Sequence, residues 1–178
     1  MEGGAAVPDR VTRLQGLPPV VDRSCTVLVL GSMPGVQSLY KQEYYGNPRN
    51  HFWRLLYTLY GADAEPSDIY EERLEFALRH HVALWDVLAS CERKGSLDAD
   101  IRQPEANDFP AFFQAYPALQ RVFFNGQAAE RMYRKHVIPV LRAQGVGAKL
   151  RCATLPSTSP ARTISFEAKL AMWRVLRS

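Results

Sequence analysis

Three short segments of the sequence combine glycine, proline and small polar residues in a way that suits chemistry. They are Gly31-Ser32-Met33-Pro34-Gly35, Asn125-Gly126 and Pro156-Ser157-Thr158-Ser159-Pro160. A glycine turn offers fixed backbone N–H groups to a developing negative charge, and serine, threonine and asparagine side chains add hydrogen-bond donors and acceptors. These segments therefore predict a site that holds a polar or anionic group through hydrogen bonds.

The patterns of other common enzyme classes are missing from the chain. The turn at Gly31 is neither a dinucleotide-binding fingerprint nor a P-loop, and no G-x-S-x-G motif is present. His80 and His81 adjoin each other, and His51 and His136 are isolated, so no two histidines have the spacing of a helical metal pair. We therefore expect neither a metal site nor an organic cofactor.

Strands that alternate with helices are expected to position these turns. Apolar runs predict strands at Cys25–Leu30, Val82–Leu88, Arg121–Phe124 and Lys149–Leu155. Helical spacing predicts helices at Pro48–Tyr60, Glu71–His80, Phe109–Tyr116, Gln127–His136 and Phe166–Leu176, with a loop at Val36–Gly46. The expected fold class is α/β: a three-layer α/β/α sandwich around a mostly parallel sheet of about four strands. Parallel sheets bind ligands at the carboxyl ends of their strands, where the three turns would meet.

Length and composition indicate one globular domain. Of the 178 residues, the polar stretch 1–16 is expected to be a flexible leader and residues 17–178 the folded domain. Cys25, Cys91 and Cys152 form no C-x-x-C pair, so we expect reduced thiols in the core. No apolar run approaches the roughly 18 residues of a membrane span, and the first residues lack a signal-peptide pattern. The expected location is cytoplasmic, with action at a bacterial nucleoid or in a nucleus left open.

Charge is distributed unevenly along the chain. The 22 Lys and Arg exceed the 18 Asp and Glu and give a net charge of +4. Residues 61–108 hold 12 of the acids, whereas residues 121–162 hold eight Lys or Arg and the single acid Glu130. A basic region of this kind is typical of proteins that bind the phosphate backbone of nucleic acids. The alternative is a solvated surface with a chance asymmetry.

Three motifs in a fixed order carry a resemblance to a known family. The first is the Gly31–Gly35 turn, the second is Tyr44-Tyr45-Gly46-Asn47-Pro48-Arg49-Asn50-His51-Phe52-Trp53, and the third is Leu155–Ala161. With these motifs, residues 17–178 resemble the uracil-DNA glycosylase superfamily, and most closely its branch of hypoxanthine-DNA (deoxyinosine) glycosylases. The N-P-x-N-x-F-W pattern is also similar to the mismatch-specific uracil and thymine glycosylases.

The resemblance implies a DNA repair enzyme that flips a deaminated base out of the helix and hydrolyses its N-glycosidic bond, which leaves an abasic site. Hydrolysis creates a cation-like sugar and an anionic base, so it needs a positioned water and N–H donors near the base. The N–H groups of the Gly31–Gly35 turn suit the second task. The motifs contain no lysine, so the resemblance implies a water nucleophile. DNA is the expected partner, and the expected state is a monomer.

The catalytic asparagine is expected at Asn50. Many superfamily members carry a water-positioning Asp or Asn where this chain has Met33, and a thioether cannot orient a water through a strong hydrogen bond. The hypoxanthine branch resembles this chain in that loss and uses the asparagine of P-R-N, which is Asn50 here. With Asn47 as N-cap, Asn50 would lie in the electropositive first turn of the helix. The alternative role for Asn50 is a second capping residue.

Base binding is assigned to the Gly31–Gly35 turn, Tyr45 and Asn125. Tyr45 matches the aromatic residue that stacks on the flipped base in related enzymes, and loop packing is its alternative role. The Asn125 amide can pair with hypoxanthine, which presents an N1–H donor beside an O6 acceptor, whereas adenine reverses that pattern. The alternative role for Asn125 is that of a turn former before Gly126.

DNA binding is assigned to Ser157, Thr158, Ser159 and Arg162. The three hydroxyl residues offer O–H and N–H groups to phosphates, and their loop could enter the minor groove. Relatives often carry asparagine where this chain has Arg162, which favours a phosphate contact over a contact with the base. Trp53, Trp85 and Trp173 are expected in the core. Two rival functions remain: a uracil or thymine mismatch glycosylase, and a catalytically silent nucleic-acid-binding module, which Met33 keeps open.

Overall fold

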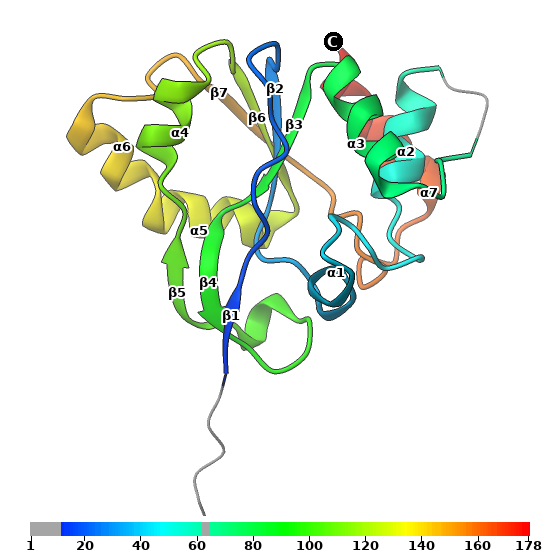
Figure 1. The fold of residues 1–178 in the computed structure, drawn as a ribbon, viewed down its shortest axis with the longest axis horizontal. Helices are drawn as coiled ribbons and strands as arrows, with labels where there is room; N and C mark the ends of the chain where they lie inside the picture. The colour runs from blue at the N-terminus through cyan, green and yellow to red at the C-terminus, as the bar shows by residue number, and fades with distance from the viewer. Residues whose placement is uncertain (1–11, 62–64) are drawn as a thin grey trace, which may run out of the picture.

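A four-stranded parallel sheet forms the centre of the protein, in a computed structural model that describes residues 12–61 and 65–178 (Figure 1). Its strands are β2 (Val27–Gly31), β3 (Val82–Asp86), β6 (Arg121–Asn125) and β7 (Arg151–Leu155), in the order β3-β2-β6-β7. Every neighbouring pair is parallel. All residues of β2 and β3 are buried, as expected for central strands covered on both faces.

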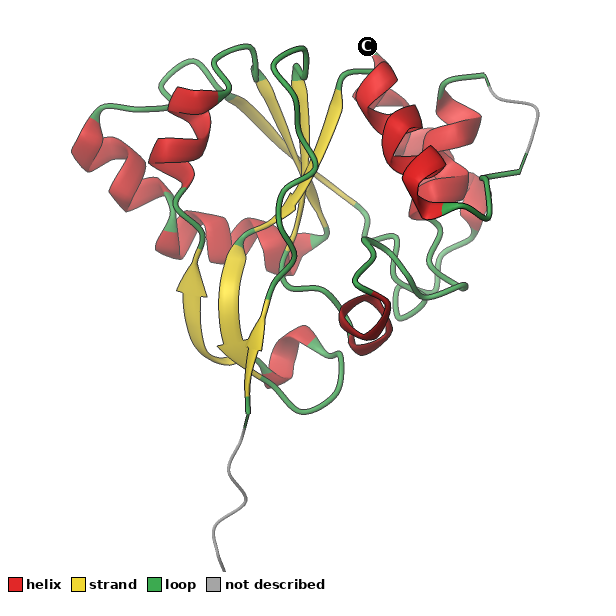
Figure 2. Ribbon diagram, in the orientation of Figure 1, coloured by secondary structure: helices red, strands yellow, loops and turns green. Residues whose placement is uncertain are grey.

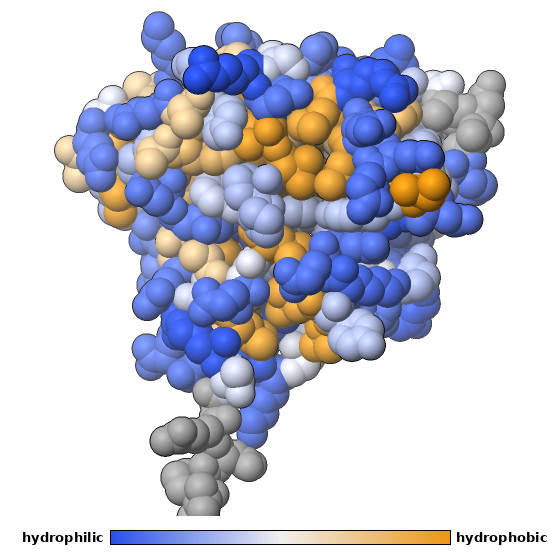
Figure 3. Space-filling view, in the orientation of Figure 1, coloured by the Kyte–Doolittle hydropathy of each residue, from blue (hydrophilic) through white to orange (hydrophobic). Residues whose placement is uncertain are grey.

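Helices cover both faces of this sheet (Figure 2). One group holds α2 (Phe52–Leu59), α3 (Tyr70–Arg79) and α7 (Phe166–Trp173), and the other holds α4 (Phe109–Ala115), α5 (Gln127–His136) and α6 (Ile138–Gln144). Alternate strand residues feed the two cores: Val29 and Leu84 pack in one, Leu28 and Trp85 in the other. Hydrophobic side chains show between the two groups of helices in Figure 3, among mostly hydrophilic neighbours. The expected three-layer α/β fold is confirmed.

A second, antiparallel sheet extends beyond the carboxyl ends of the parallel strands. It contains β1 (Arg13–Gln15), β4 (Leu88–Glu92) and β5 (Arg102–Ala106), in the order β1-β4-β5, with the short 3-10 helix η1 (Asp98–Asp100) between β4 and β5. The expected strand Val82–Leu88 is therefore wrong at its end, because Val87 separates two strands of different sheets. The Val87 N–H donates to the Gly31 carbonyl at 2.8 Å and fixes this bend.

The expected flexible leader, residues 1–16, is wrong for residues 13–15, which form strand β1. Arg13 donates from Nε to Ser90 Oγ at 3.0 Å and from a guanidinium nitrogen to the Gln103 carbonyl at 2.7 Å. Residues 13–15 are thus held by partners far along the chain, and residues 1–11 lie outside the described part. The folded domain therefore begins before residue 17.

Other elements differ from the expectation in smaller ways. Helix α1 (Val36–Lys41) lies within the expected loop, α6 was not expected, and a 3-10 turn, η2 (Arg174–Arg177), follows α7. Cys25 and Cys91 are buried, but Cys152 is exposed on β7, which is an edge strand. The three tryptophans are buried as expected. No helix in the described residues is long and apolar enough to cross a membrane.

The basic residues of 121–162 do not form one surface. Arg121 and Arg151 lie side by side in the register of β6 and β7, at the amino ends of these strands. Arg121 donates to the carbonyl of Leu176, at 3.4 Å, rather than facing the three turns. Arg162, in contrast, follows the carboxyl end of β7. The uneven charge in the sequence is therefore spread over both ends of the sheet.

Candidate active site

The carboxyl ends of the parallel strands bring the three turns together around one cavity of about 610 Å³. The expected site residues that line it are Gly31, Ser32, Met33, Pro34, Gly35, Tyr45, Asn50, Asn125, Ser157, Thr158 and Ser159. Arg162 is exposed just beyond Ala161, the last lining residue of the loop. No group of three His, Cys, Asp or Glu in residues 12–61 and 65–178 could hold a metal ion.

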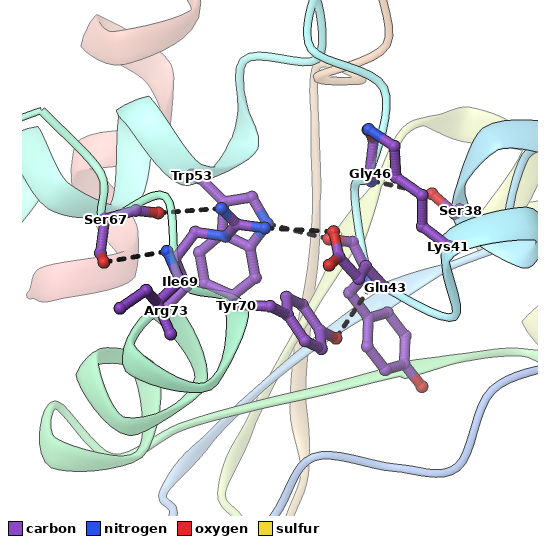
Figure 4. Close-up of polar contacts among 10 residues, drawn as sticks. Ser38, Lys41, Glu43, Gly46, Trp53, Ser67, Ile69, Tyr70 and Arg73 are labelled. Carbon is purple, nitrogen blue, oxygen red and sulfur yellow. Dashed lines mark hydrogen bonds and ion pairs between the residues drawn. The ribbon is translucent and has the colours of Figure 1, made fainter.

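A polar network shapes the chain between α1 and α2 (Figure 4). The Gly46 N–H donates to Ser38 Oγ at 2.9 Å, and Lys41 Nζ donates to the Gly46 carbonyl at 2.8 Å. The Tyr44 N–H donates to the Tyr70 hydroxyl at 2.9 Å, and the Trp53 indole N–H donates to the Tyr44 carbonyl at 2.8 Å. These bonds tie the segment to α1, α2 and α3.

An ion pair closes the same network. The Arg73 guanidinium lies 3.2 Å from the Glu43 carboxylate and also donates to the Ser67 carbonyl at 2.8 Å. Both charged side chains are largely buried, so the pair is better shielded from solvent than a surface ion pair. The backbone that presents Tyr45 is therefore held on both sides.

Tyr45 is fixed in an unusual conformation at the cavity. Its φ angle is 55°, in the left-handed region that non-glycine residues seldom occupy. One face of its ring stacks on Phe52, with the ring centroids 4.1 Å apart. Its hydroxyl is buried without a hydrogen-bond partner among the described residues. Burial, with the nearby Asp86 carboxylate, raises the pKa of Tyr45. A stacked base could therefore use only the other face of the ring.

Asn50 lies before helix α2 and not in its first turn. The expected helix start at Pro48 is wrong because Asn47 to Asn50 form a separate turn, in which the Asn50 N–H donates to the Asn47 carbonyl at 2.9 Å. The Asn50 Oδ1 accepts from the Phe52 N–H at 2.9 Å, so the side chain caps α2. This leaves its Nδ2 and a second lone pair of Oδ1 for the cavity.

The first glycine turn is held from behind by Arg93. Its guanidinium donates to the Pro34 carbonyl at 2.6 Å and to the Gly95 carbonyl at 2.7 Å. The Ser32 hydroxyl donates to Asp98 on η1. Met33 is buried, with only 6% of its surface exposed, and lines the cavity. The segment Ser96–Asp98, which connects β4 to β5 and reaches the start of η1, thus forms one wall of the cavity, which the sequence analysis did not foresee.

The loop after β7 is braced against β6, α2 and α7. Asn125 Oδ1 accepts from the Thr158 N–H, and Asn125 Nδ2 donates to Thr158 Oγ1, both at 2.9 Å. The Thr158 carbonyl accepts from the His51 N–H at 3.0 Å. Thr158 is fully buried, and its side chain holds the loop through Asn125. The expected contact between this side chain and a DNA phosphate is therefore wrong. Ser157 and Ser159 remain partly exposed.

Helix α7 completes this brace from behind the loop. The Trp173 indole N–H donates to the Pro156 carbonyl at 2.9 Å, and Lys169 Nζ donates to the Ser159 carbonyl at 3.2 Å. Lys169 is fully buried. Its burial, and then the charge of Arg162, lower the pKa of its ammonium group. Two side chains of one helix therefore hold the backbone of the third motif.

Asp86 is the site residue that the sequence analysis missed. It is the last residue of β3, lines the cavity and is 5% exposed. The expected strand Val82–Leu88 contained Asp86 in its interior, so the sequence analysis did not place Asp86 at the end of a strand. The available signal was a single acid in an otherwise apolar run, Val82-Ala83-Leu84-Trp85-Asp86-Val87-Leu88. A buried acid in such a run needs a partner or a function.

Comparison with known proteins identifies the family of the chain. The sequence model described as "Uracil DNA glycosylase superfamily" matches residues 18–177. The chain belongs to the uracil DNA glycosylase superfamily. The family interpretation of the three motifs is therefore confirmed.

Two curated relatives are similar over most of their length. "Hypoxanthine DNA glycosylase" of Methanosarcina barkeri (strain Fusaro) is 38% identical over 159 residues, which covers 89% of this chain and 94% of the relative. "Hypoxanthine DNA glycosylase" of Methanosarcina acetivorans is 37% identical over 147 residues, which covers 83% and 87%. A solution NMR structure of a candidate uracil DNA glycosylase from M. acetivorans matches with a TM-score of 0.74 and 34% identity, and covers 94% of this chain and 100% of that one.

Proposed function

We propose that the protein is a DNA glycosylase that hydrolytically releases hypoxanthine from deoxyinosine in DNA and leaves an abasic site. The observation that carries this proposal is the single cavity in which Asn50, the Gly31–Gly35 turn and the Ser157–Ser159 loop meet. Membership of a superfamily of DNA glycosylases makes DNA the substrate. The names of the two curated relatives support hypoxanthine as the base.

The chemistry follows from the bond that breaks. As the bond between C1′ and N9 cleaves, its electron pair stays on the base and positive charge builds on the sugar. Backbone N–H groups of the Gly31–Gly35 turn would donate to the departing base. The Asn50 amide would orient a water toward C1′ through the Oδ1 lone pair and the Nδ2 that α2 leaves unused. Addition of this water to C1′, with loss of its proton to solvent, completes the hydrolysis.

A water nucleophile suits the positions of the lysines near the site. Lys169 lies behind the loop after β7 and donates to the Ser159 carbonyl, and Lys41 donates to the Gly46 carbonyl. Neither lines the cavity. All residues assigned to the chemistry come from one chain, so we propose that the enzyme acts as a monomer. The flipped nucleotide would enter between the Ser157–Ser159 loop and the wall formed by η1.

Excision of uracil or thymine is the rival activity, because the superfamily and the NMR structure carry the name uracil DNA glycosylase. The second rival is a nucleic-acid-binding module without catalytic activity, because Met33 occupies the position at which many superfamily members carry a water-positioning Asp or Asn. Labelled duplexes that contain inosine, uracil, xanthine or only normal bases separate these functions. After alkali, which cleaves abasic sites, we expect strand breaks at inosine in the presence of excess EDTA. Breaks at uracil alone would support the rival enzyme, and binding without breaks would support the silent module.

A further inference from the structure

The carboxyl group of Asp86 is a buried group with unused hydrogen-bonding capacity at the floor of the cavity. Its Oδ2 is buried without a hydrogen-bond partner among the described residues. Its Oδ1 lies 2.4 Å from the position that a Cβ on Gly31 would take, so only a glycine leaves room for the carboxyl group there. The Tyr45 hydroxyl, also unpartnered, lies 3.8 Å from the same position. Unpaired buried polar atoms are costly, and a ligand that enters the cavity can satisfy them.

The charged and titratable groups around Asp86 favour its neutral form. Burial, followed by the charge of Asp98 on η1, raises the pKa of Asp86 to about 7, although the Arg93 guanidinium behind the glycine turn opposes this shift. Tyr44 and Tyr45, from the segment before α2, are neutral phenols whose pKa values are raised by burial and then by the charge of Asp86. The Tyr44 hydroxyl itself donates to the Pro18 carbonyl at 2.8 Å. The Asp86 carboxyl group therefore changes its protonation state close to neutral pH.

The two protonation states differ in what they can recognise. An ionised carboxylate only accepts hydrogen bonds, whereas a neutral carboxyl group accepts through one oxygen and donates through the other. Hypoxanthine presents an N1–H donor, and adenine presents a bare N1 acceptor at the same place. Either form of Asp86 can accept from the N1–H of hypoxanthine, but only the neutral form can donate to the N1 of adenine.

We propose that Asp86 contacts N1 of the flipped purine and, when ionised, excludes adenine while accepting hypoxanthine. This inference rests on the proposed function and names the residue that sets its base specificity. It moves the main task from Asn125, whose amide orientation is fixed by one hydrogen bond from its Nδ2 and one to its Oδ1, both with Thr158. Normal DNA offers adenine in great excess, so rejection of adenine is the selectivity that such an enzyme needs most.

Binding at different pH values tests the proposal without chemistry. The probes are matched duplexes with inosine or adenosine that carry a 2′-fluorine, which destabilises the cationic sugar and slows cleavage. Between pH 6 and pH 8 the neutral fraction of Asp86 falls roughly tenfold. We expect the affinity for the adenosine duplex, divided by that for the inosine duplex, to fall roughly tenfold over the same range. General effects of pH on DNA binding cancel in this ratio.

Asp86→Asn provides the matched variant. The amide of the variant can turn either its oxygen or its NH₂ toward N1, so the ratio of adenosine affinity to inosine affinity should not change with pH. At pH 8 this ratio should be higher in the variant than in the parent. Asp68→Asn, the same substitution at an exposed position just before α3 and outside the lining of the cavity, should behave like the parent. A ratio in the parent that does not vary with pH, or a variant that titrates like the parent, would overturn the proposal. A parent that releases no hypoxanthine would instead refute the proposed function.

Discussion

The two sides of the cavity differ in how their buried polar atoms are used. In the loop Pro156–Pro160, Thr158 exchanges two hydrogen bonds with Asn125, and helix α7 binds two further carbonyls. At the floor, Asp86 Oδ2 and the Tyr45 hydroxyl have no partner in the described part of the chain. Paired groups hold the shape of the site, and unpaired groups are left for a ligand. Among the side chains that line the cavity, the state of each buried polar atom thus separates support from recognition.

The largest effect is expected at Asn50, which combines both uses. Its Oδ1 caps α2, and its Nδ2 has no hydrogen-bond partner among residues 12–61 and 65–178. Asn50→Ala should lower the single-turnover rate of hypoxanthine release by roughly a hundredfold or more, because one pre-positioned polar group at the reacting centre is lost. DNA binding should remain nearly intact. Quenched-flow or gel assays with enzyme in excess measure this rate.

Two further variants serve as controls for that prediction. Asn50→Asp keeps an oxygen that can hold the water and should retain part of the activity. Met33→Ala should reduce the rate much less, because a thioether contributes packing but little orientation of water. If Asn50→Ala released the base as fast as the parent, or if Met33→Ala were the more damaging change, the catalytic role would not belong to Asn50.

The next effect concerns the supporting side. Asn125→Ala removes both hydrogen bonds to Thr158 and leaves a buried N–H and a buried hydroxyl without partners. We expect the free energy of unfolding to fall by about 2 kcal/mol. Thr158→Val removes only the hydroxyl and should have about half this effect. Urea unfolding followed by fluorescence measures both, and equal stability of the parent and Asn125→Ala would show that the brace is not structural.

On the recognition side, removal of a charge should stabilise the protein. The pKa of Asp86 is raised in the folded state, from an ordinary value of 3.8 to about 7. The stability of the parent therefore falls as the pH rises from about 4 to 7, since the folded state holds the proton more tightly than the unfolded state. Asp86→Asn has no ionisable group at this position, so its stability does not fall for this reason as the pH rises.

The measurement is urea unfolding of the parent and Asp86→Asn at pH 5 and pH 8. We expect the variant to gain at least about 1 kcal/mol relative to the parent on going from pH 5 to pH 8. The opposite trend, with the variant losing relative to the parent at high pH, would mean that the ionised Asp86 is well paired in the fold.

The smallest effect is expected outside the cavity, at Arg162. If this exposed side chain contacts one phosphate, Arg162→Ala should weaken binding a few-fold for all sequences alike and should reduce the slope of log affinity against log salt by about one unit. Arg142→Ala removes an exposed charge on α6, away from the cavity, and should leave the slope unchanged. Titrations at several salt concentrations distinguish the two variants, and equal slopes for both would remove Arg162 from the DNA interface.

The sequence predicted the parallel sheet and most of the cavity for a clear physical reason. Strands buried on both faces, such as Val27–Gly31, need continuous apolar runs, and the turns that end them need glycine or proline. Strand β5 could not be found in this way because Arg102–Ala106 contains a proline and two charged residues and is paired on one edge only. Strand β1 depends on partners more than 70 residues away along the chain. Such long-range pairing leaves little local signal.

The site showed the same limit. Local patterns identified the residues in the glycine and proline turns, but the use of each side chain depends on its neighbours in space. Asn125 and Thr158 are far apart in the sequence, and only their contact shows that the Asn125 amide holds the loop after β7. The bend at Val87, which ends β3 and exposes Asp86 to the cavity, depends on a bond to Gly31. Neither fact is contained in the spacing of residues.

Helix α7 has a consequence for when the enzyme can work during its own synthesis. Lys169 and Trp173 hold the carbonyls of Ser159 and Pro156, and in the chain they follow every residue that lines the cavity. Domains emerge from the ribosome amino end first, so the sheet and the glycine turn are made before the helix that braces the last loop. A nascent chain can therefore assemble the floor of the cavity early, but the cavity reaches its final shape only after α7 has left the exit tunnel.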